Sequence, residues 1–173
     1  MKKWTIDPSH TEIGFRVKHM MFTNVKGQFD DYTATIDFDN DLKDAHLQFE
    51  AKINSISTRN ADRDNHLRSA DFFDVEQYPT LNFKSTHIEG NGNEYEITGD
   101  LTIKGVTKPI KLHAEFSGLM TDPWGNTKVG LNLDGKINRK DFGLTYNAAL
   151  ETGGVLVGED VKLNAEIQLI EEK

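Results

Sequence analysis

The chain has 173 residues, the length of one ordinary domain and enough to bury a sizeable core. Its 20 basic and 28 acidic residues give a net charge of −8. No segment gathers Lys and Arg, which disfavours nucleic acid and anionic membranes as partners. The chain also lacks cysteine and any apolar run of ~18 residues, which excludes disulfides, thiolate chemistry and a membrane-spanning helix. We expect a single domain over residues 1–173.

The N-terminus begins with a positive pair but lacks the apolar stretch of a secretory signal. Lys2 and Lys3 are followed by Trp4-Thr5-Ile6-Asp7-Pro8, which contains an acid and a proline. This order predicts no signal peptide. We therefore expect a cytoplasmic location.

Apolar and polar residues alternate with a period of two in eight segments, which is typical of half-buried β-strands. In the second segment the phase slips near Asp30-Asp31, which we interpret as a β-bulge in one continuous strand. Lys104-Gly105 lies between two such segments and predicts a tight hairpin. The segments cover about residues 11–19, 25–38, 46–53, 81–86, 95–103, 110–116, 129–137 and 161–169.

The alternation stops between residues 57 and 76. Thr58 or Asn60 predicts the N-cap of a short helix over about residues 61–69. A helical insertion around residues 60–75 of a barrel commonly lies across one end. The dense polar run over residues 58–68 has two interpretations: a solvated helix with local Asp–Arg pairs, or a polar gate over an apolar cavity.

Eight amphipathic strands with short connections favour either a closed up-and-down barrel or a two-sheet sandwich. An eight-stranded barrel is either filled by side chains or holds one small ligand. The inward faces include several small residues, which either leave space for a ligand or relieve crowding where the strands coil. These residues are Gly27, Ala51, Gly99, Ala114, Gly135 and Ala165.

No catalytic or metal-binding motif stands out. A zinc site needs three or four of the six histidines to converge, and the alternation points His46 and His113 outward. Ser9 and His10 are adjacent, so in a strand their side chains would point to opposite sides. We therefore predict no metal and no enzyme activity.

Several ordered motifs are similar to those of the YceI-like family, also called polyisoprenoid-binding proteins, along nearly the whole chain. They are IDPSHT at 6–11, GQF at 27–29, SIST at 55–58, RDNHLRSADFFD at 63–74, GDLTIKGVT at 99–107, INRKDFG at 137–143 and VGEDV at 157–161. The resemblance implies an all-β fold: a lipocalin-like, eight-stranded antiparallel up-and-down barrel whose internal cavity holds a long-chain lipid. It also implies that a homodimer is a reasonable expectation. It implies no catalytic activity and no cofactor beyond a bound isoprenoid or other lipid.

A cavity for a lipid chain needs an apolar lining and one polar end. From the inward-facing positions we predict that the lining includes Phe15, Val17, Phe49, Phe83, Leu101, Leu112, Phe116 and Leu131. For the polar end we choose His19, Arg63, His66, Ser85, Asn138 and Arg139. Arg139 has an alternative role as a structural partner of Asp141 or of carbonyls at a strand end.

The first functional hypothesis is binding, storage or transport of a polyisoprenoid, an isoprenoid quinone or a fatty amide. The second is an isomerase, cyclase or hydrolase that acts on a hydrophobic substrate in the same barrel. It requires a titratable group inside the cavity, and the alternation places His19 there. The third is a structural or interaction module whose barrel is filled.

Overall fold

The computed structural model describes residues 1–20, 22–146 and 157–173. The described part contains a single α-helix, α1 (Ala61–Arg68). Short 3-10 turns lie at Pro8–His10, Ile53–Ser55 and Arg139–Phe142. The strands are β1 (Lys3–Ile6), β2 (Glu12–His19), β3 (Thr23–Phe29), β4 (Tyr32–Asp37), β5 (His46–Lys52), β6 (Ile56–Ser57), β7 (Thr80–Asn91), β8 (Glu94–Ile103), β9 (Val106–Phe116), β10 (Met120–Thr121), β11 (Thr127–Asn138) and β12 (Val157–Glu171).

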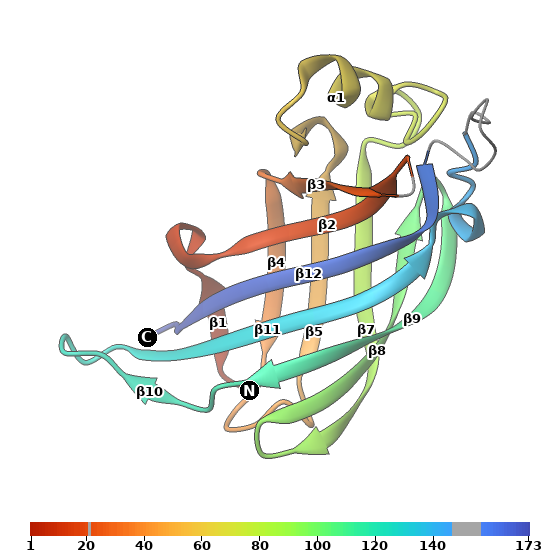
Figure 1. Ribbon diagram of the computed structural model, residues 1–173. Coiled ribbons are helices and arrows are strands. Elements are labelled where there is room, and N and C mark those ends of the chain that lie inside the picture. Colours follow the sequence, from red (N-terminus) through yellow and green to blue (C-terminus); the bar gives the residue numbers. More distant parts are fainter. Residues whose placement is uncertain (21, 147–156) are drawn as a thin grey trace.

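The strands close into a barrel in which every neighbouring pair is antiparallel (Figure 1). The order β11–β9–β8–β7–β5–β4–β1–β12 returns to β11, so the sheet has no free edge within this circle. β1 and β2 both pair with β12 and together act as one interrupted strand. On their other side, β4 pairs with β1 and β3 pairs with β2, so β3 and β4 form a second interrupted strand. The described residues thus form the eight-stranded up-and-down barrel that the family resemblance implies, and of the two architectures that the alternation left open, closure excludes the sandwich.

The expected bulge at Asp30-Asp31 is instead a break between two strands. β3 ends at Phe29 and β4 begins at Tyr32. The amide of Asp30 donates to the carbonyl of Ser55, and the carbonyl of Asp31 accepts from the amide of Lys52. The backbone at the break therefore bonds to the turn that links β5 to β6, and the chain bends there. β1 is a second difference, because the alternation first becomes clear only after Pro8.

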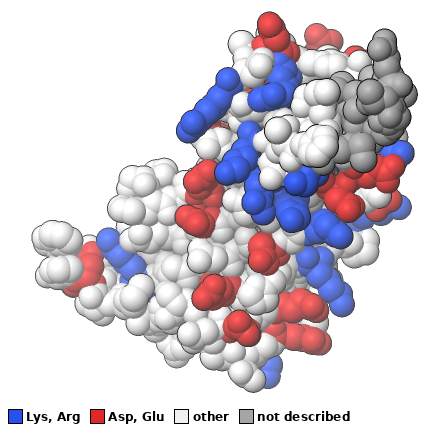
Figure 2. Space-filling model, viewed as in Figure 1, with Lys and Arg blue, Asp and Glu red and all other residues white. Residues whose placement is uncertain are grey.

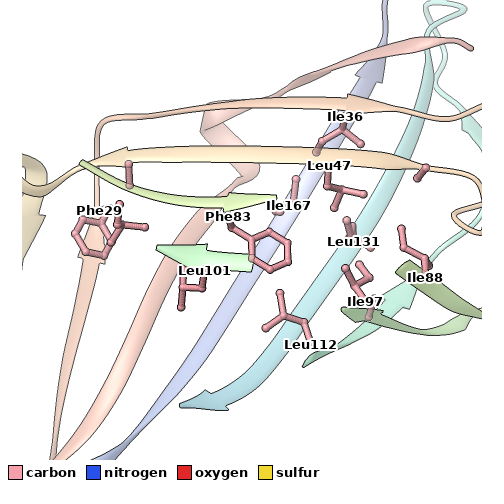
Figure 3. Packing of buried hydrophobic residues seen from close by; sticks show 14 of the residues in the cluster. Phe29, Ile36, Leu47, Phe83, Ile88, Ile97, Leu101, Leu112, Leu131 and Ile167 are labelled. Atoms are coloured by element: carbon pink, nitrogen blue, oxygen red, sulfur yellow. The ribbon is translucent and has the colours of Figure 1, made fainter. Parts of the chain in front are cut away.

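The end of the barrel away from α1 is filled by an aromatic cluster. The ring of Trp4 stacks on Phe38 at a centroid distance of 4.6 Å, and its Nε1 donates to the Phe38 carbonyl at 3.0 Å. Phe116 packs edge-on against both Phe38 and Tyr95. Aliphatic residues of the same core extend the packing. Figure 3 shows Ile88, Ile97 and Leu131 together, with Phe29 toward the other end.

The β8–β9 hairpin has the expected tight turn. Lys104 and Gly105 both have positive φ, 52° and 75°, as a two-residue type I′ turn requires. Glycine takes this conformation without strain. The turn aligns two long strands that carry inward-facing residues along much of the barrel.

Candidate functional site: an apolar cavity under a helical lid

The half of the barrel nearest α1 contains a cavity of about 220 Å³. Nearly all of its lining side chains are apolar and come from strands around the barrel, together with Leu67, Phe72 and Phe73 from α1 and the segment after it. Among the lining residues Gln48 and Asn164 are exposed, whereas Arg139 is only 3% exposed. The cavity is therefore apolar, and the guanidinium of Arg139 is the buried cation in its wall.

Six of the eight predicted lining residues do line the cavity: Phe15, Val17, Phe49, Phe83, Leu101 and Leu112. The other two, Phe116 and Leu131, are buried in the filled end of the barrel. Alternation tells which side chains point inward, but it does not tell how far along the barrel axis each one lies. Lining residues outside our prediction include Leu144, which follows the 3-10 turn after β11, and Val157, the first residue of β12.

The inward-facing glycines admit large neighbouring side chains. A Cβ on Gly27 would lie 2.3 Å from the ring of Phe15, and a Cβ on Gly99 would lie 2.4 Å from the ring of Phe83. The small residues at these two positions thus relieve crowding, which is one of the two interpretations above. The rings that they accommodate are themselves part of the cavity wall.

Arg139 is positioned by the turn that follows β11. The side chain of Asn138 caps this turn by accepting from the amide of Lys140 at 2.9 Å, and Gly143 ends it with a φ of 76°. The guanidinium of Arg139 donates to the carbonyls of Gly158 at 2.8 Å and Tyr146 at 2.9 Å, and also to those of Leu144 and Val157. Its structural partners are therefore carbonyls, which is the second of the two partners named in our alternative, and not Asp141.

Burial lowers the pKa of the Arg139 guanidinium, and the nearby Glu159 acts in the opposite direction. An arginine remains charged even so. Within the described residues, its hydrogen bonds go to neutral carbonyl groups. A formal positive charge therefore lies in the wall of an apolar cavity, where a ligand with a negative or carbonyl oxygen would find a strong donor nearby.

The insertion that carries α1 covers the cavity as a lid (Figure 1). The helix begins as predicted, because the side chain of Asn60 accepts from the amide of Arg63 at 3.0 Å. Asp64 is buried and accepts from both the amide and the hydroxyl of Thr58, at 2.8 and 2.6 Å. Arg63 donates to the same hydroxyl at 2.8 Å. Hydrogen bonds within the polar run thus connect the helix to Thr58, directly after β6. The run is therefore not simply a solvated helix with local Asp–Arg pairs.

The remaining polar candidates lie outside the cavity wall. His66 contacts Asp71 at 2.9 Å and packs edge-on behind Phe72. The hydroxyl of Ser85 accepts from the amide of Leu47 at 3.0 Å. Arg63 and Asn138 serve the local structures already described. His19 is half-buried at the end of β2 and is not a lining residue, so the enzyme hypothesis loses the group on which it relied.

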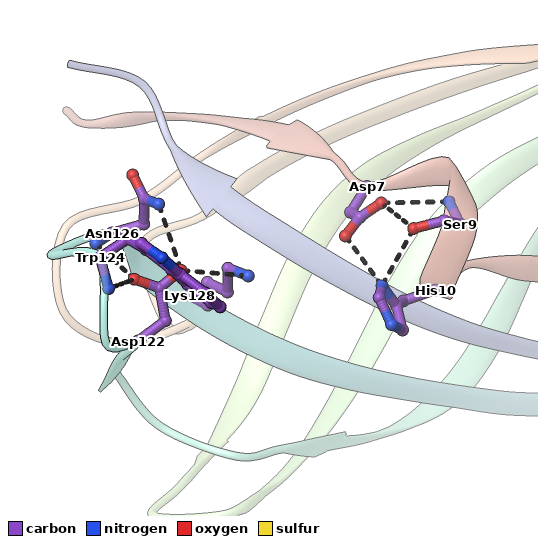
Figure 4. Close-up of polar contacts among 7 residues, drawn as sticks. All are labelled: Asp7, Ser9, His10, Asp122, Trp124, Asn126 and Lys128. Atoms are coloured by element: carbon purple, nitrogen blue, oxygen red, sulfur yellow. Dashed lines mark hydrogen bonds and ion pairs between the residues drawn. The ribbon is translucent and has the colours of Figure 1, made fainter.

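Ser9 and His10 correct one expectation, since they lie in a 3-10 turn and not in a strand. Their side chains therefore meet: Ser9 Oγ donates to Asp7 Oδ1 at 2.7 Å and lies 3.1 Å from His10 Nδ1 (Figure 4). His10 Nδ1 also contacts Asp7 Oδ2 at 2.9 Å. One nitrogen faces both partners, whereas a catalytic triad uses one ring nitrogen for the serine and the other for the acid. This cluster caps a turn.

The described residues contain no group of three metal-ligating side chains that could hold an ion. Within the same residues, no helix is long and apolar enough to cross a membrane.

A closed antiparallel barrel with one filled end, an apolar cavity and a helical lid defines a class of small proteins built to enclose a hydrophobic molecule. The chain belongs to the YceI-like family, whose domain matches residues 4–169. It is 37% identical over 170 residues to the UPF0312 protein SA2479 of Staphylococcus aureus, covering 97% of each chain.

Solved structures agree with this assignment. The YCEI protein of Campylobacter jejuni is 39% identical, and the alignment covers 100% of both chains with a TM-score of 0.78. Two more distant structures share the fold. BcnA of Burkholderia cenocepacia is 21% identical with a TM-score of 0.80 and coverage of 94% and 98%. A polyisoprenoid binding domain from Saccharophagus degradans is 12% identical with a TM-score of 0.71 and coverage of 99% and 100%.

Proposed function

We propose that this protein binds one long-chain hydrophobic molecule in its barrel and stores or transports it. The observation that carries the proposal is the composition of the cavity wall, in which Arg139 is the buried polar side chain among apolar ones. An isoprenoid chain, an isoprenoid quinone or a fatty amide combines an apolar tail with one polar end. The polyisoprenoid binding domain from Saccharophagus degradans supports this ligand class by its name alone.

The apolar wall supplies the driving force. Burial of one CH₂ group contributes about 0.8 kcal/mol, so a five-carbon unit gains roughly 3–4 kcal/mol before the cost of ordering the chain. Binding pockets commonly enclose about 300–1,000 Å³. The cavity here is smaller, about 220 Å³. A long chain therefore requires movement of the wall, and we assign this movement to the lid residues Phe72 and Phe73.

Arg139 provides the polar end. A quinone or amide oxygen, or a phosphate oxygen, would accept a charge-assisted hydrogen bond from the guanidinium. Such a headgroup would also offset the cost of burying the cation. We therefore orient the ligand with its headgroup toward the turn after β11 and its tail toward Phe83 and the filled end.

Native mass spectrometry of the purified protein, followed by organic extraction, tests the proposal directly. We expect a stoichiometric adduct of a long-chain lipid, or its uptake when isoprenoids, quinones or fatty amides are added to the apo form. A clean apo mass with no uptake would refute the binding function. The same spectrum tests our expectation of a homodimer.

A matched pair of variants locates the ligand. Ala34 lines the cavity, and the adjacent Thr33 is exposed on the outer face of β4. Ala34→Phe fills the compartment and should abolish uptake, whereas Thr33→Phe adds the same group outside and should leave uptake unchanged. Equal uptake by the two folded variants would show that the lipid binds elsewhere.

A further inference from the structure

Four basic residues from four neighbouring strands lie side by side on the outer face of the barrel. Arg16 of β2 is directly opposite Lys26 of β3 and, on its other side, Lys162 of β12. Lys162 is in turn directly opposite Lys136 of β11. All four are exposed. They are far apart in sequence, which is why the composition of any one segment gives no sign of this basic stripe.

Like charges directly opposite each other destabilise a sheet, so this arrangement is unfavourable for folding alone. Lys136 forms an ion pair with Asp160 at 3.8 Å. Within the described residues, the other three members of the stripe form no ion pair. The stripe therefore keeps most of its positive charge available to a partner.

Charge also separates along these strands. Glu12 begins β2 and is directly opposite Glu166 of β12, whereas Arg16 and Lys162 lie nearer the lid. Beyond Lys162, Glu159 and Asp160 of β12 pair with Lys140 and Lys136. Figure 2 shows blue side chains gathered over the upper parts of these strands, with red ones below them and to their right. A protein with a net charge of −8 thus presents a local positive face beside the mouth of its cavity.

Apolar side chains project from the same end of the barrel. In the β2–β3 connection Phe22 is 87% exposed and Met20 is 48% exposed. We call Met20 and Phe22 the Phe22 tip. Lys18, also exposed, lies between this tip and the basic stripe on the outward face of β2. At about 3.3 Å per residue, Met20 lies roughly 13 Å beyond Arg16.

From this juxtaposition we infer that the basic stripe and the Phe22 tip dock the protein on an anionic phospholipid surface. Lys and Arg are attracted to acidic headgroups, and an exposed aromatic enters the interface between headgroups and acyl chains. The exposed Met20 beside Phe22 favours a membrane over a nucleic acid, because bases stack on aromatic rings and not on aliphatic side chains. Strand β2 connects the two sites, because Phe15 and Val17 face the cavity while Arg16 and Lys18 face outward. Docking therefore places the lid end against the membrane.

The test is co-sedimentation with vesicles of 60% phosphatidylcholine and 40% phosphatidylglycerol, compared with pure phosphatidylcholine. We expect binding to the anionic vesicles alone, and its loss in 0.5 M NaCl, because salt screens exposed charges. Arg16→Gln with Lys162→Gln should weaken binding roughly 25-fold, about fivefold per charge. Lys43→Gln with Lys84→Gln makes the same change in net charge away from the stripe and should have little effect.

The tip has its own matched control. Phe22→Ser should weaken vesicle binding, whereas Trp124→Ser should not. Trp124 is 80% exposed in the β10–β11 connection, and this connection lies at the end of the barrel away from α1 (Figure 1). Circular dichroism confirms that each variant is folded. The inference fails if the wild type does not bind anionic vesicles, if both charge pairs weaken binding equally, or if a DNA or RNA oligonucleotide competes the protein off the vesicles. None of these outcomes depends on the ligand in the cavity, so they leave the proposed function separately testable.

Discussion

Arg139 illustrates how a single buried residue holds the site together. Its guanidinium bonds carbonyls on both sides of it, those of Leu144 and Tyr146 after β11 and those of Val157 and Gly158 at the start of β12. Replacement by leucine would leave buried acceptors without donors, so we expect Arg139→Leu to lose about 2–4 kcal/mol of unfolding free energy. Urea unfolding followed by tryptophan fluorescence measures this loss.

The neighbouring Lys140 gives the control for that change. It is exposed and pairs with Glu159 at 2.8 Å. Because surface ion pairs contribute less than about 1 kcal/mol, Lys140→Leu should change stability little. Equal losses in the two variants would mean that the carbonyl contacts of Arg139 are not what stabilises the fold.

Gly99 provides the second prediction at this scale. A Cβ there would meet the ring of Phe83 at 2.4 Å and the backbone carbonyl of Lys84 at 2.6 Å, and the carbonyl has little freedom to move. We expect Gly99→Ala to cost about 1–3 kcal/mol. Gly130→Ala is the control, since the nearest atom would lie at 3.6 Å, and it should be neutral or slightly stabilising. Thermal melts measure the difference. Equal melting temperatures for the two variants would contradict the crowding that we expect at Gly99.

The same residues show what the sequence can and cannot predict about the site. Alternation correctly places Phe15 and Phe83 inside, because side-chain direction follows from local backbone geometry. It also points Phe116 inward, but that ring lies in the filled end, since depth depends on how strands are staggered around the barrel. For Ser85 the decisive fact is a bond to the amide of Leu47, which lies 38 residues away.

At the scale of elements, the lid depends on the buried carboxylate of Asp64. Asp64→Ala would leave the amide and hydroxyl of Thr58 without their acceptor, so the lid should open more often. We expect amide hydrogen exchange to accelerate across Ala61–Arg68 while β8 and β9 keep their protection. Asp62→Ala removes the same charge from an exposed position and should leave exchange unchanged. Uniform acceleration across the barrel would indicate global destabilisation instead.

The β10–β11 hairpin has a carboxylate that should make its stability depend on pH. Asp122 accepts hydrogen bonds from the amides of Asn126 and Trp124, both at 2.9 Å, and pairs with Lys128 at 3.2 Å (Figure 4). These contacts, the Asn126 amide first, lower the pKa of Asp122 to about 2. A depressed pKa in the folded state contributes stability above the unfolded value near 4, and this contribution is lost as the pH falls toward 2.

Asp122→Asn removes that pH-dependent contribution. Between pH 5 and pH 2 the urea midpoint of the wild type should therefore fall more steeply than that of the variant. Asp44→Asn, in the exposed β4–β5 connection, is the control and should follow the wild type. Parallel curves for Asp122→Asn and the wild type would contradict the assignment.

Element boundaries were predictable where a single local pattern dominates. The helix begins after Asn60 and the hairpin turns at Lys104-Gly105, because a cap and a type I′ turn depend on adjacent residues. The pattern at Asp30-Asp31 predicts a bulge and not the observed break, since the form of the break depends on bonds to Lys52 and Ser55, which are distant in sequence and lie at the neighbouring β5–β6 turn.

At the scale of the whole molecule, closure of the barrel creates features that no segment carries alone. It joins two inner environments, an aromatic cluster around Trp4 and an apolar cavity whose wall includes small residues such as Ala34 and Ala165. It also aligns Arg16 with Lys162 on the outside. Composition argued against anionic surfaces, because a charge pattern assembled from distant strands is invisible in a linear count.

Closure also makes ligand binding and folding one linked equilibrium, which gives the last prediction. A lipid that binds only the closed barrel adds about 2.7 kcal/mol of stability at a free concentration of 100 times its Kd. For a domain of this size the melting temperature should rise by roughly 5–10 °C. Ala34→Phe, whose cavity is filled, should show no rise, while Thr33→Phe should match the wild type. A shift of equal size in all three proteins would mean that the lipid stabilises the outer surface, and the cavity would lose its role as the binding site.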